Sequence, residues 1–326
     1  MKKFNLSTIQ IGDIILTTTT ELLSKGIRKV TKGDISHALI YVGAGSVIDS
    51  TNEGVRSRNL QRLFLEDGSA VHVLRLADEL SKIKARQIVD FARQRIGTQY
   101  SIIEAVRTVV GGAREPSRRQ FCSRLAAQAY ASAGLHIAAD PNYCTPEDLK
   151  SSALLIVVPD VVVDVDKEEV EALQRIPDAT QWMADVTRAL LSGSRERNSA
   201  IEAVDDIDKH LQQTPEDDAY FAELFEKSGY LTVWKREAEK NPWMYDPQLM
   251  RNSPLSDAQK QEYCNIVLND HGEGMHRYEH NLKHYASLVQ VYPLNTFRRL
   301  LVLYEKLVEL QRLRRQTAEQ WVRRGD

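Results

Sequence analysis

The sequence predicts an α+β domain over residues 1–165, with an antiparallel sheet and packed helices, followed by an all-helical domain over residues 166–326. Three observations predict this class. A chain of 326 residues is longer than one typical hydrophobic core supports. Short runs of β-forming residues alternate with helical patterns in the first half. After an acidic passage that begins at Asp164, β-type runs disappear, and prolines separate a series of helical segments.

Short apolar and β-branched runs supply the predicted sheet. Residues 36–42 end at Gly43, and the chain resumes at residues 47–49 after a glycine-containing turn, so these two strands are predicted to form a hairpin. Residues 71–76 alternate apolar and polar side chains, which indicates a strand with one face in water. The remaining predicted strands cover residues 11–16, 154–158 and 161–163.

Helical patterns fill the spaces between these strands. Residues 84–95 and 121–132 each carry an apolar stripe, and Gly97 and Gly134 stand where helices commonly stop. Thr145, followed by a proline and two acids, predicts the start of a further helix. In the second domain, helices are predicted over residues 180–191, 197–212, 219–239, 257–269, 275–291 and 295–322.

Composition narrows the functional classes. A hydrophobic share of 42% and a charged share of 27% are typical of soluble globular proteins. The formal net charge of -2 argues against a nucleic-acid partner, because phosphate binding needs a concentrated basic surface. The basic cluster near the C-terminus is interleaved with glutamates, as on a solvated helix face. No stretch approaches about twenty apolar residues, so no transmembrane segment is expected.

The N-terminal segment and the cysteines indicate the cellular compartment of the protein. Lys2 and Lys3 precede no apolar run of signal-peptide length. Three cysteines, Cys122, Cys144 and Cys264, lie far apart in the sequence, which predicts no disulfide framework and fits a reducing compartment. We therefore expect a chain that is cytoplasmic as synthesised. Export as an effector would follow a route that reads no cleavable signal.

Cys122 opens a predicted helix and is the first candidate for chemistry. A thiol at a helix N-terminus faces backbone N–H groups and the positive end of the helix dipole, which favours the thiolate. Arg124 acts in the same direction. A catalytic thiolate normally pairs with a histidine. The alternative is that Cys122 is a small buried hydrophobic residue on an apolar helix face.

His37 and Asp49 are the candidate partners of this thiol. His37 lies at the start of a predicted strand, which is a rigid platform for a side chain that must meet a helix-borne sulfur. Asp49 falls on the next strand of the predicted hairpin, where it can lie beside His37. A carboxylate there would hold the imidazole in one tautomer and stabilise its charged form. The alternatives are a structural histidine at a strand edge and a solvated acid.

An ordered set of short motifs links these candidates to a known family. The set is Gly12-Asp13-Ile14-Ile15, Ser36-His37, Tyr41 and Gly43, Val47-Ile48-Asp49, Gly97 through Tyr100, Phe121-Cys122-Ser123, and Thr145-Pro146. In order and spacing the chain resembles the YiiX/YebB-like family of permuted NlpC-type, papain-fold cysteine hydrolases over about residues 8–160. The resemblance implies a papain-like fold in permuted order for residues 1–165.

The resemblance also implies a catalytic triad. Cys122 would attack a carbonyl and form an acyl-enzyme, His37 would act as general base and then acid, and Asp49 would orient the imidazole. Two positions depart from the family pattern. The orienting acid is often glutamate, so Glu53 is a reserve for Asp49, and Phe121 stands where tyrosine is common.

Three further residues are candidates for the substrate side of the site. Backbone N–H groups at the start of the Cys122 helix, with Ser123 among them, would form the oxyanion hole. Asp13 would cap the first turn or line the cleft, and Tyr100 would border the substrate groove or pack beneath it. No cofactor is implied.

A histidine ladder in the second domain raises a competing possibility. His276, His280 and His284 repeat every four residues on a predicted helix, so two imidazoles could bind one metal ion. No glutamate is placed as in a zincin motif, and no cysteine pair completes a tetrahedral set. A solvated helix stripe is the favoured interpretation, and no metal site is predicted.

The functional hypothesis is a cysteine hydrolase that cleaves an amide, ester or thioester. Relatives in the family cut peptide bonds in cell-wall fragments, and others act on lipids or protein conjugates, so the expected partner is a peptide, acyl-lipid or conjugate substrate. The helical domain would cover the cleft, recognise substrate or bind a partner protein. The alternatives are an inactive papain-like binding module, an acyltransferase with the same Cys–His pair, and, on the histidine ladder, a metal protein.

Overall fold

The computed structural model describes residues 1–18, 35–100, 120–269 and 273–323. Contacts within the chain divide it into two compact units. Unit 1 holds residues 1–184 and 202–204, and unit 2 holds residues 185–201 and 205–326. The sequence predicts two domains that meet near residue 165. That boundary stays a prediction, because the two units are defined by contacts and not by independent folding.

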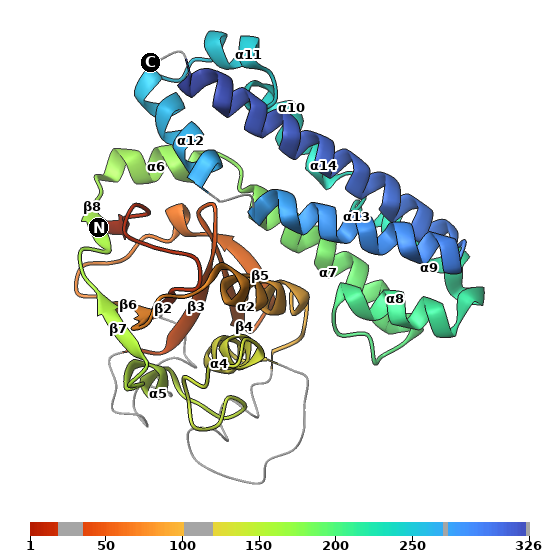
Figure 1. The fold of residues 1–326 in the computed structure, drawn as a ribbon, viewed down its shortest axis with the longest axis horizontal. Coiled ribbons are helices and arrows are strands. Elements are labelled where there is room, and N and C mark those ends of the chain that lie inside the picture. The colour runs from red at the N-terminus through yellow and green to blue at the C-terminus, as the bar shows by residue number, and fades with distance from the viewer. Residues whose placement is uncertain (19–34, 101–119, 270–272, 324–326) are drawn as a thin grey trace. The chain divides into compact units, whose positions relative to one another are not determined.

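A six-stranded antiparallel sheet is the centre of unit 1 (Figure 1). Its spatial order is β5-β4-β3-β2-β6-β7, and every neighbouring pair is antiparallel. The strands are β2 (Ile14–Thr17), β3 (His37–Gly43), β4 (Ser46–Thr51), β5 (Gly54–Asn59), β6 (Val71–Leu76) and β7 (Leu155–Val158). A separate two-stranded sheet pairs β1 (Lys2–Phe4) with β8 (Val162–Asp164). The predicted α+β class with an antiparallel sheet is confirmed.

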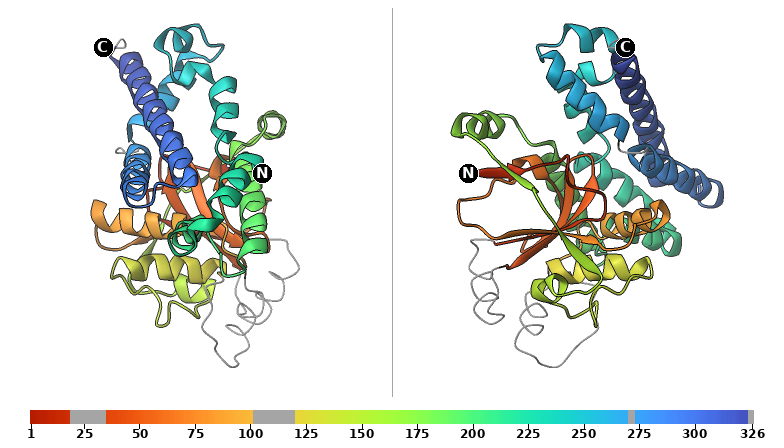
Figure 2. Two further views of the ribbon diagram at one scale, coloured as in Figure 1. Left: turned by 90° about the vertical axis from the view of Figure 1, so that its right-hand side faces the viewer. Right: turned by 60° about the vertical axis from the view of Figure 1, so that its left-hand side comes forward.

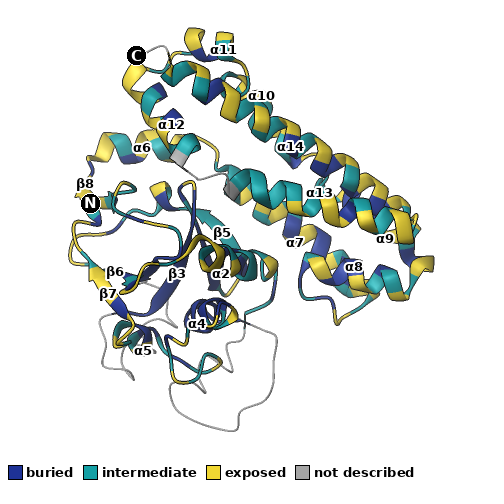
Figure 3. Ribbon diagram, in the orientation of Figure 1, coloured by how far each residue is buried: buried dark blue, intermediate teal, exposed yellow. Residues whose placement is uncertain are grey.

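Both faces of the sheet are covered, because alternate residues of β2, β3, β4 and β6 enter different apolar clusters. The central strand β3 is buried along its whole length (Figure 3). Ile14 and Ile40 point to the face on which α2 (Lys82–Gln94) and α4 (Cys122–Ser132) pack. Figures 1 and 2 show these two helices on one side of the sheet. Ile15 and Leu39 point to the opposite face and pack with residues of the N-terminal segment.

The predicted hairpin is formed by β3 and β4. Leu39 lies opposite Asp49 in its register, and the turn runs through residues 43–45, all of which have a positive φ. Because side chains alternate along a strand, His37 and Asp49 lie diagonally on the same face of the sheet. The hairpin therefore brings the polar side chains of His37 and Asp49 together.

Strand β5 was not predicted. Its sequence is Gly-Val-Arg-Ser-Arg-Asn, which has one β-forming residue, and it becomes a strand because it pairs with β4 along its whole length. Gly54 begins it with φ of 92°, and a Cβ at this position would lie 2.7 Å from the carbonyl oxygen of Thr98. Val55 N–H donates to that oxygen, and Gly97 N–H donates to Val55 oxygen. These bonds attach β5 to the segment that leads toward the candidate nucleophile.

The short helix α5 (Pro146–Lys150) confirms a capping prediction. Thr145 is its N-cap, and its side chain accepts from the backbone of Asp148 while the Asp148 carboxylate accepts from the backbone of Thr145. This reciprocal arrangement satisfies two donors that the helix itself leaves without partners. The segment between α4 and α5 covers residues 133–145, and α5 follows directly after it.

The part of the chain after β8 is helical, as predicted. Its described helices are α6 (Lys167–Arg175), α7 (Ala179–Arg197), α8 (Val204–Gln213), α9 (Asp218–Lys227), α10 (Val233–Lys240), α11 (Pro247–Asn252), α12 (Asp257–Asn269), α13 (Glu273–Val291) and α14 (Asn295–Val322). Among the described residues, no helix combines the length and apolar composition that a membrane span requires.

Two predicted helices differ from those in the structure. The pattern over residues 219–239 predicted one helix, but Gly229 adopts φ of 80° and separates α9 from α10. The pattern over residues 197–212 predicted one helix from Arg197, but α7 runs to that residue and α8 begins at Val204. The Asn198 side chain accepts from Ala200 N–H, a local turn that ends α7.

Candidate active site

His37 is the first residue of β3, and its side chain is buried. The strand start is held by two features. Ser36 N–H donates to the carbonyl oxygen of Thr17 at 3.0 Å, and Thr17 lies opposite His37 in the β2–β3 register. The imidazole therefore projects from a backbone that is fixed on both sides of its Cα atom.

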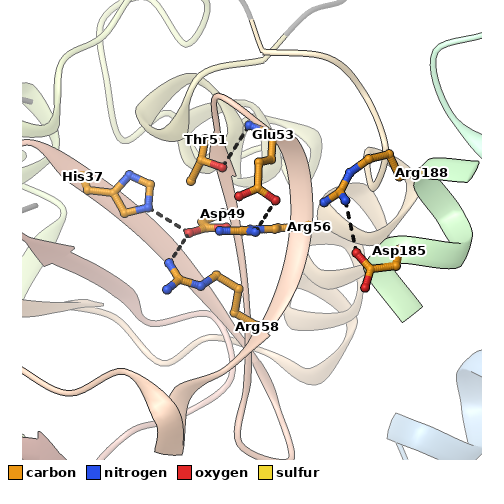
Figure 4. Close-up of polar contacts among 8 residues, drawn as sticks. All are labelled: His37, Asp49, Thr51, Glu53, Arg56, Arg58, Asp185 and Arg188. Atoms are coloured by element: carbon orange, nitrogen blue, oxygen red, sulfur yellow. Dashed lines mark hydrogen bonds and ion pairs between the residues drawn. The ribbon is translucent and has the colours of Figure 1, made fainter. Parts of the chain in front are cut away.

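Asp49 lies on β4 beside His37, and its side chain is fully buried. His37 Nε2 lies 2.9 Å from Asp49 Oδ2, and Arg58 Nη1 donates to the same oxygen at 3.0 Å (Figure 4). Burial raises the pKa of Asp49, but the hydrogen bond from His37 and the charges of His37 and Arg58 outweigh burial and leave it below its ordinary value. Asp49 is thus held as a carboxylate.

Cys122 is the first residue of α4, and 6% of it is exposed. Its thiol is among the groups that raise the pKa of His37, so the sulfur lies beside the imidazole. Asp49 occupies Nε2 of the ring, which leaves Nδ1 for the sulfur. Figure 4 shows the second ring nitrogen of His37 pointing away from Asp49. The imidazole therefore lies between a carboxylate and a sulfur, with one nitrogen for each.

The surroundings of His37 favour its charged form. Burial lowers the pKa of His37, but hydrogen bonds to Asp49 and Cys122, with their electrostatic attraction, outweigh burial and raise it to about 10. The ring therefore carries a proton at neutral pH. Such a ring can stabilise negative charge on sulfur and can donate a proton to a leaving group.

The start of α4 leaves backbone donors without helical partners. Its first intrahelical bond runs from Leu125 N–H to Phe121 oxygen, and the N-cap Phe121 contributes no side-chain cap. The N–H groups of Cys122 and Ser123 belong to this first turn, at the positive end of the helix dipole. Such N–H groups can donate hydrogen bonds to an anionic oxygen close to the Cys122 sulfur.

Ser123 and Cys144 are joined by two reciprocal bonds. The Ser123 hydroxyl donates to Cys144 oxygen at 2.6 Å, and the Cys144 thiol donates to Ser123 oxygen at 3.4 Å. The hydroxyl is therefore committed to the backbone, and only the Ser123 N–H remains for the oxyanion. Burial, followed by the charge of Asp148, raises the pKa of Cys144 to about 12, so this thiol stays protonated.

Arg124 stabilises the same segment. It is fully buried, its Nε donates to Asn142 oxygen at 2.7 Å, and its guanidinium lies over the rings of Phe121 and Tyr143 at 4.6 and 5.0 Å. The aromatic ring of Phe121 thus packs on this cation. Arg124 and Ser123 together fix the first turn of α4 against residues 142–144.

The remaining predicted site residues take different places. Both Asp13 oxygens accept from Arg75, at 2.8 and 2.7 Å, so its carboxylate is used in an ion pair. Tyr100 forms a parallel bridge with Gln120, two residues before Cys122, which places it next to the site. Glu53, the reserve for the orienting acid, pairs with Arg56 at 2.7 Å (Figure 4). The structure thus brings Asp49 rather than Glu53 to His37.

Arg58 is the site residue that sequence reasoning missed. It lies on the unpredicted strand β5, where Arg58 pairs with Val47 and therefore lies diagonal to Asp49 on the same face. One signal was available. Arg56 and Arg58 stand two positions apart after a glycine, which is the spacing of residues on one face of a strand.

The histidine ladder lies on α13, and its members have separate surroundings. The rings of His276 and His280 are 6.4 Å apart, whereas His284 Nε2 lies 3.0 Å from Asp208 Oδ2. Across the described residues, no group of three or more His, Cys, Asp or Glu side chains is arranged to hold a metal ion.

Comparisons with known proteins concern the first half of the chain. Residues 8–152 match the model of the family described as permuted papain-like amidase enzyme, YaeF/YiiX, C92 family. A crystal structure of the metalloprotein yiiX from Escherichia coli O157:H7 matches with 19% identity and a TM-score of 0.38, covering 46% of this chain and 97% of that one. No curated protein matches this sequence.

Proposed function

We propose, from the premise that residues 8–152 form a domain of the permuted papain-like amidase family, that Cys122 is the nucleophile of a cysteine hydrolase acting through an acyl-enzyme. The family makes this part of the chain a papain-like hydrolase domain of the amidase type. The assignment of Cys122, His37 and Asp49 to its chemistry rests on their geometry.

The observation that carries the proposal is the double engagement of the His37 ring. Nε2 is bound to Asp49, and the thiol of Cys122 also acts on the ring, for which Nδ1 is the nitrogen that remains. A general acid–base residue must be within hydrogen-bond reach of the group it serves, and a third group must orient it. His37 meets both conditions. Asp49 fixes the ring and stabilises its charge, so that the proton-bearing nitrogen stays directed at the reacting atoms.

The proposed reaction has two halves. The sulfur of Cys122 attacks the carbonyl carbon, and the backbone N–H groups of Cys122 and Ser123 stabilise the oxyanion. His37 gives its proton to the leaving amine as the carbon–nitrogen bond breaks, which leaves a thioester on Cys122. Water then attacks this thioester while His37 takes its proton, and the carbon–sulfur bond breaks to release the acid and restore the thiolate of Cys122 beside a protonated His37.

The substrate proposed first is a peptide-like amide, because the family is one of amidases. Acyl-lipid and conjugate substrates, esters and thioesters follow the same chemistry, with another leaving group in place of the amine. Transfer of the acyl group to an amine or alcohol instead of water is the acyltransferase variant of the same cycle. We propose substrate recognition or partner binding for the helical part.

The test is covalent labelling with peptide, lipid and isopeptide electrophiles. The native chain is compared with Cys122→Ala and with Cys264→Ala, a matched control because Cys264 is also a buried thiol. We expect labelling on Cys122 in the native chain and in Cys264→Ala, and none in Cys122→Ala. The preferred electrophile identifies the substrate class.

Three outcomes would contradict parts of the proposal. A folded native chain that none of the electrophiles labels, and whose three cysteines react slowly and equally with iodoacetamide, would identify an inactive binding module. Labelling that persists in Cys122→Ala would reject this nucleophile. Products in which added amines or alcohols carry the acyl group would replace hydrolysis with transfer.

A further inference from the structure

We propose that Arg58 is a positioning residue of this site, which extends the line of interacting groups to Cys122, His37, Asp49 and Arg58. The inference rests on the proposed function and adds a fourth residue to the three that carry its chemistry. Arg58 acts through Asp49 by holding its carboxylate in the orientation that directs His37 to the sulfur.

The first support is strand geometry. Residue 58 lies opposite Val47, so its side chain is diagonal to Asp49 and on the same face of the sheet. Its Nη1 donates to Asp49 Oδ2 at 3.0 Å. Arg56 lies directly opposite Asp49, yet its guanidinium is turned to Glu53 at 2.7 Å. Of two neighbouring arginines, only Arg58 is engaged with the acid (Figure 4).

The second support is how Asp49 is satisfied. Both of its hydrogen bonds converge on Oδ2, and within the described part of the chain Oδ1 is buried without a hydrogen-bond partner. A carboxylate that is 0% exposed is costly unless charges and hydrogen bonds compensate it. Among the described residues, removal of Arg58 would leave the His37 ring as the hydrogen-bond partner that compensates it.

The third support is charge balance. In the ion-pair form of the site, Cys122 is negative, His37 positive and Asp49 negative, so these three groups carry one unbalanced negative charge. Arg58 cancels it. Its side chain is 32% exposed, so its own charge keeps contact with water while its Nη1 reaches the buried acid. This arrangement supplies a positive charge without burying it fully.

The consequence concerns the acid side of the pH profile. The groups facing Asp49 are His37 from β3 and Arg58 from β5, with Arg56 opposite it and paired to Glu53; Cys122 of α4 faces His37. Since His37 and Arg58 both lower the pKa of Asp49, removing Arg58 raises it. Asp49 then takes a proton at a higher pH, and His37 loses its anionic partner there.

The experiment measures two rates from acidic to mildly alkaline pH. One is the rate of Cys122 alkylation by iodoacetamide. The other is kcat/KM for a substrate that carries the same acyl group as the electrophile that labels Cys122 best. Arg58→Ala removes both charge and donor, Arg58→Gln keeps an N–H donor without charge, and Arg58→Lys keeps charge. Arg56→Ala is the matched control from the same strand. Thermal unfolding of each variant establishes that it is folded.

We expect Arg58→Ala to move the acid limb to higher pH and to lower the rate about tenfold near that limb. Arg58→Gln should shift it nearly as far, Arg58→Lys should restore most of the native profile, and Arg56→Ala should follow the native chain. If Arg58→Ala does not fold, Arg58→Gln and Arg58→Lys still separate charge from packing.

An NMR titration of the His37 ring in the native chain and in Arg58→Gln gives a readout that needs no turnover. The perturbation caused by protonation of Asp49 should appear at higher pH in the variant. Superimposable titrations and rate profiles would overturn the role of Arg58 while native labelling of Cys122 kept the proposed function. An inert native Cys122 would overturn the function, and with it this inference.

Discussion

Two acid–histidine pairs in this chain have nearly the same internal geometry. In unit 1, His37 Nε2 lies 2.9 Å from Asp49 Oδ2, and in unit 2, His210 Nε2 lies 2.7 Å from Asp217 Oδ2. Each acid also accepts from an arginine, Arg58 for Asp49 and Arg197 for Asp217. By these contacts alone, the two pairs could not be told apart.

The difference lies at the other ring nitrogen. Nδ1 of His210 lies 3.1 Å from the Asn198 amide, and its ring packs on Phe221, so the pair joins α7, α8 and α9 as a structural unit. The other nitrogen of His37 faces the Cys122 thiol instead. An acid–histidine pair therefore becomes a candidate catalytic device only when the third group is reactive.

The acids differ as well. Asp217 uses both oxygens, Oδ1 for Arg197 and Oδ2 for His210, as a well-satisfied structural carboxylate does. Asp49 places both bonds on Oδ2. Unequal use of the two oxygens leaves the site more dependent on each bond, and substitutions should therefore act on activity in unit 1 and on stability in unit 2.

The largest expected effect comes from exchanging the two histidines for glutamine. His37→Gln should lower kcat/KM by at least about a thousandfold, because a glutamine cannot transfer the proton. His210→Gln should keep the activity per folded molecule and lower the unfolding free energy. Labelling kinetics and denaturant unfolding measure the two quantities. Equal losses of activity in both variants would remove the distinction.

The next effect comes from the two acids. Asp49→Asn should lower kcat/KM by about a hundredfold or more, because the neutral amide neither fixes the tautomer nor stabilises the imidazolium. Asp217→Asn should lower the unfolding free energy by about 2 kcal/mol, through a weakened ion pair, and leave kcat/KM within a factor of about two. An Asp49→Asn enzyme with native turnover would show that another group orients His37.

A pH dependence of stability follows from His37. Its pKa rises from 6.5 to about 10 on folding, so its contribution is complete below 6.5 and is lost as the pH rises toward 10. The difference in unfolding free energy between the native chain and His37→Gln should therefore shrink across this window. Chemical unfolding at a series of pH values measures it. A difference that is constant or grows with pH has the wrong sign for this coupling.

The smallest effect separates the two roles of Ser123. Ser123→Ala removes the hydroxyl bond to Cys144 oxygen and should lower the unfolding free energy by about 1 kcal/mol, while the backbone N–H stays in place. The kcat of the folded Ser123→Ala variant should then be close to that of the native chain. A large drop in kcat with unchanged stability would instead assign the hydroxyl to the oxyanion hole.

Much of the fold could be predicted because its signals are local. The run that became β3, the glycine turn after it and the Thr145 cap each carry their information within a few residues. The helix that follows Gln120 begins with Cys122 at its first position, as predicted. These signals specify an element and its ends without reference to the rest of the chain.

The division of the second part into helices was less predictable. Residues 219–239 have a continuous helical pattern, and the break at Gly229 depends on a left-handed backbone that a glycine permits but does not require. A glycine at position 193 lies inside α7 without ending it, and a Cβ there would lie 2.6 Å from the Leu224 side chain. Whether a glycine ends a helix or admits a neighbour is decided by packing.

The sequence by itself determined that a sheet-containing part precedes a helical one, the hairpin that carries His37 and Asp49, and the position of a thiol at a helix start, since short-range patterns encode all three. Only the tertiary structure decided that Asp49 rather than Glu53 meets the imidazole, and that Arg58 meets Asp49. Those choices depend on the register between strands, and a polar edge strand such as β5 takes its register from its partner rather than from its own residues.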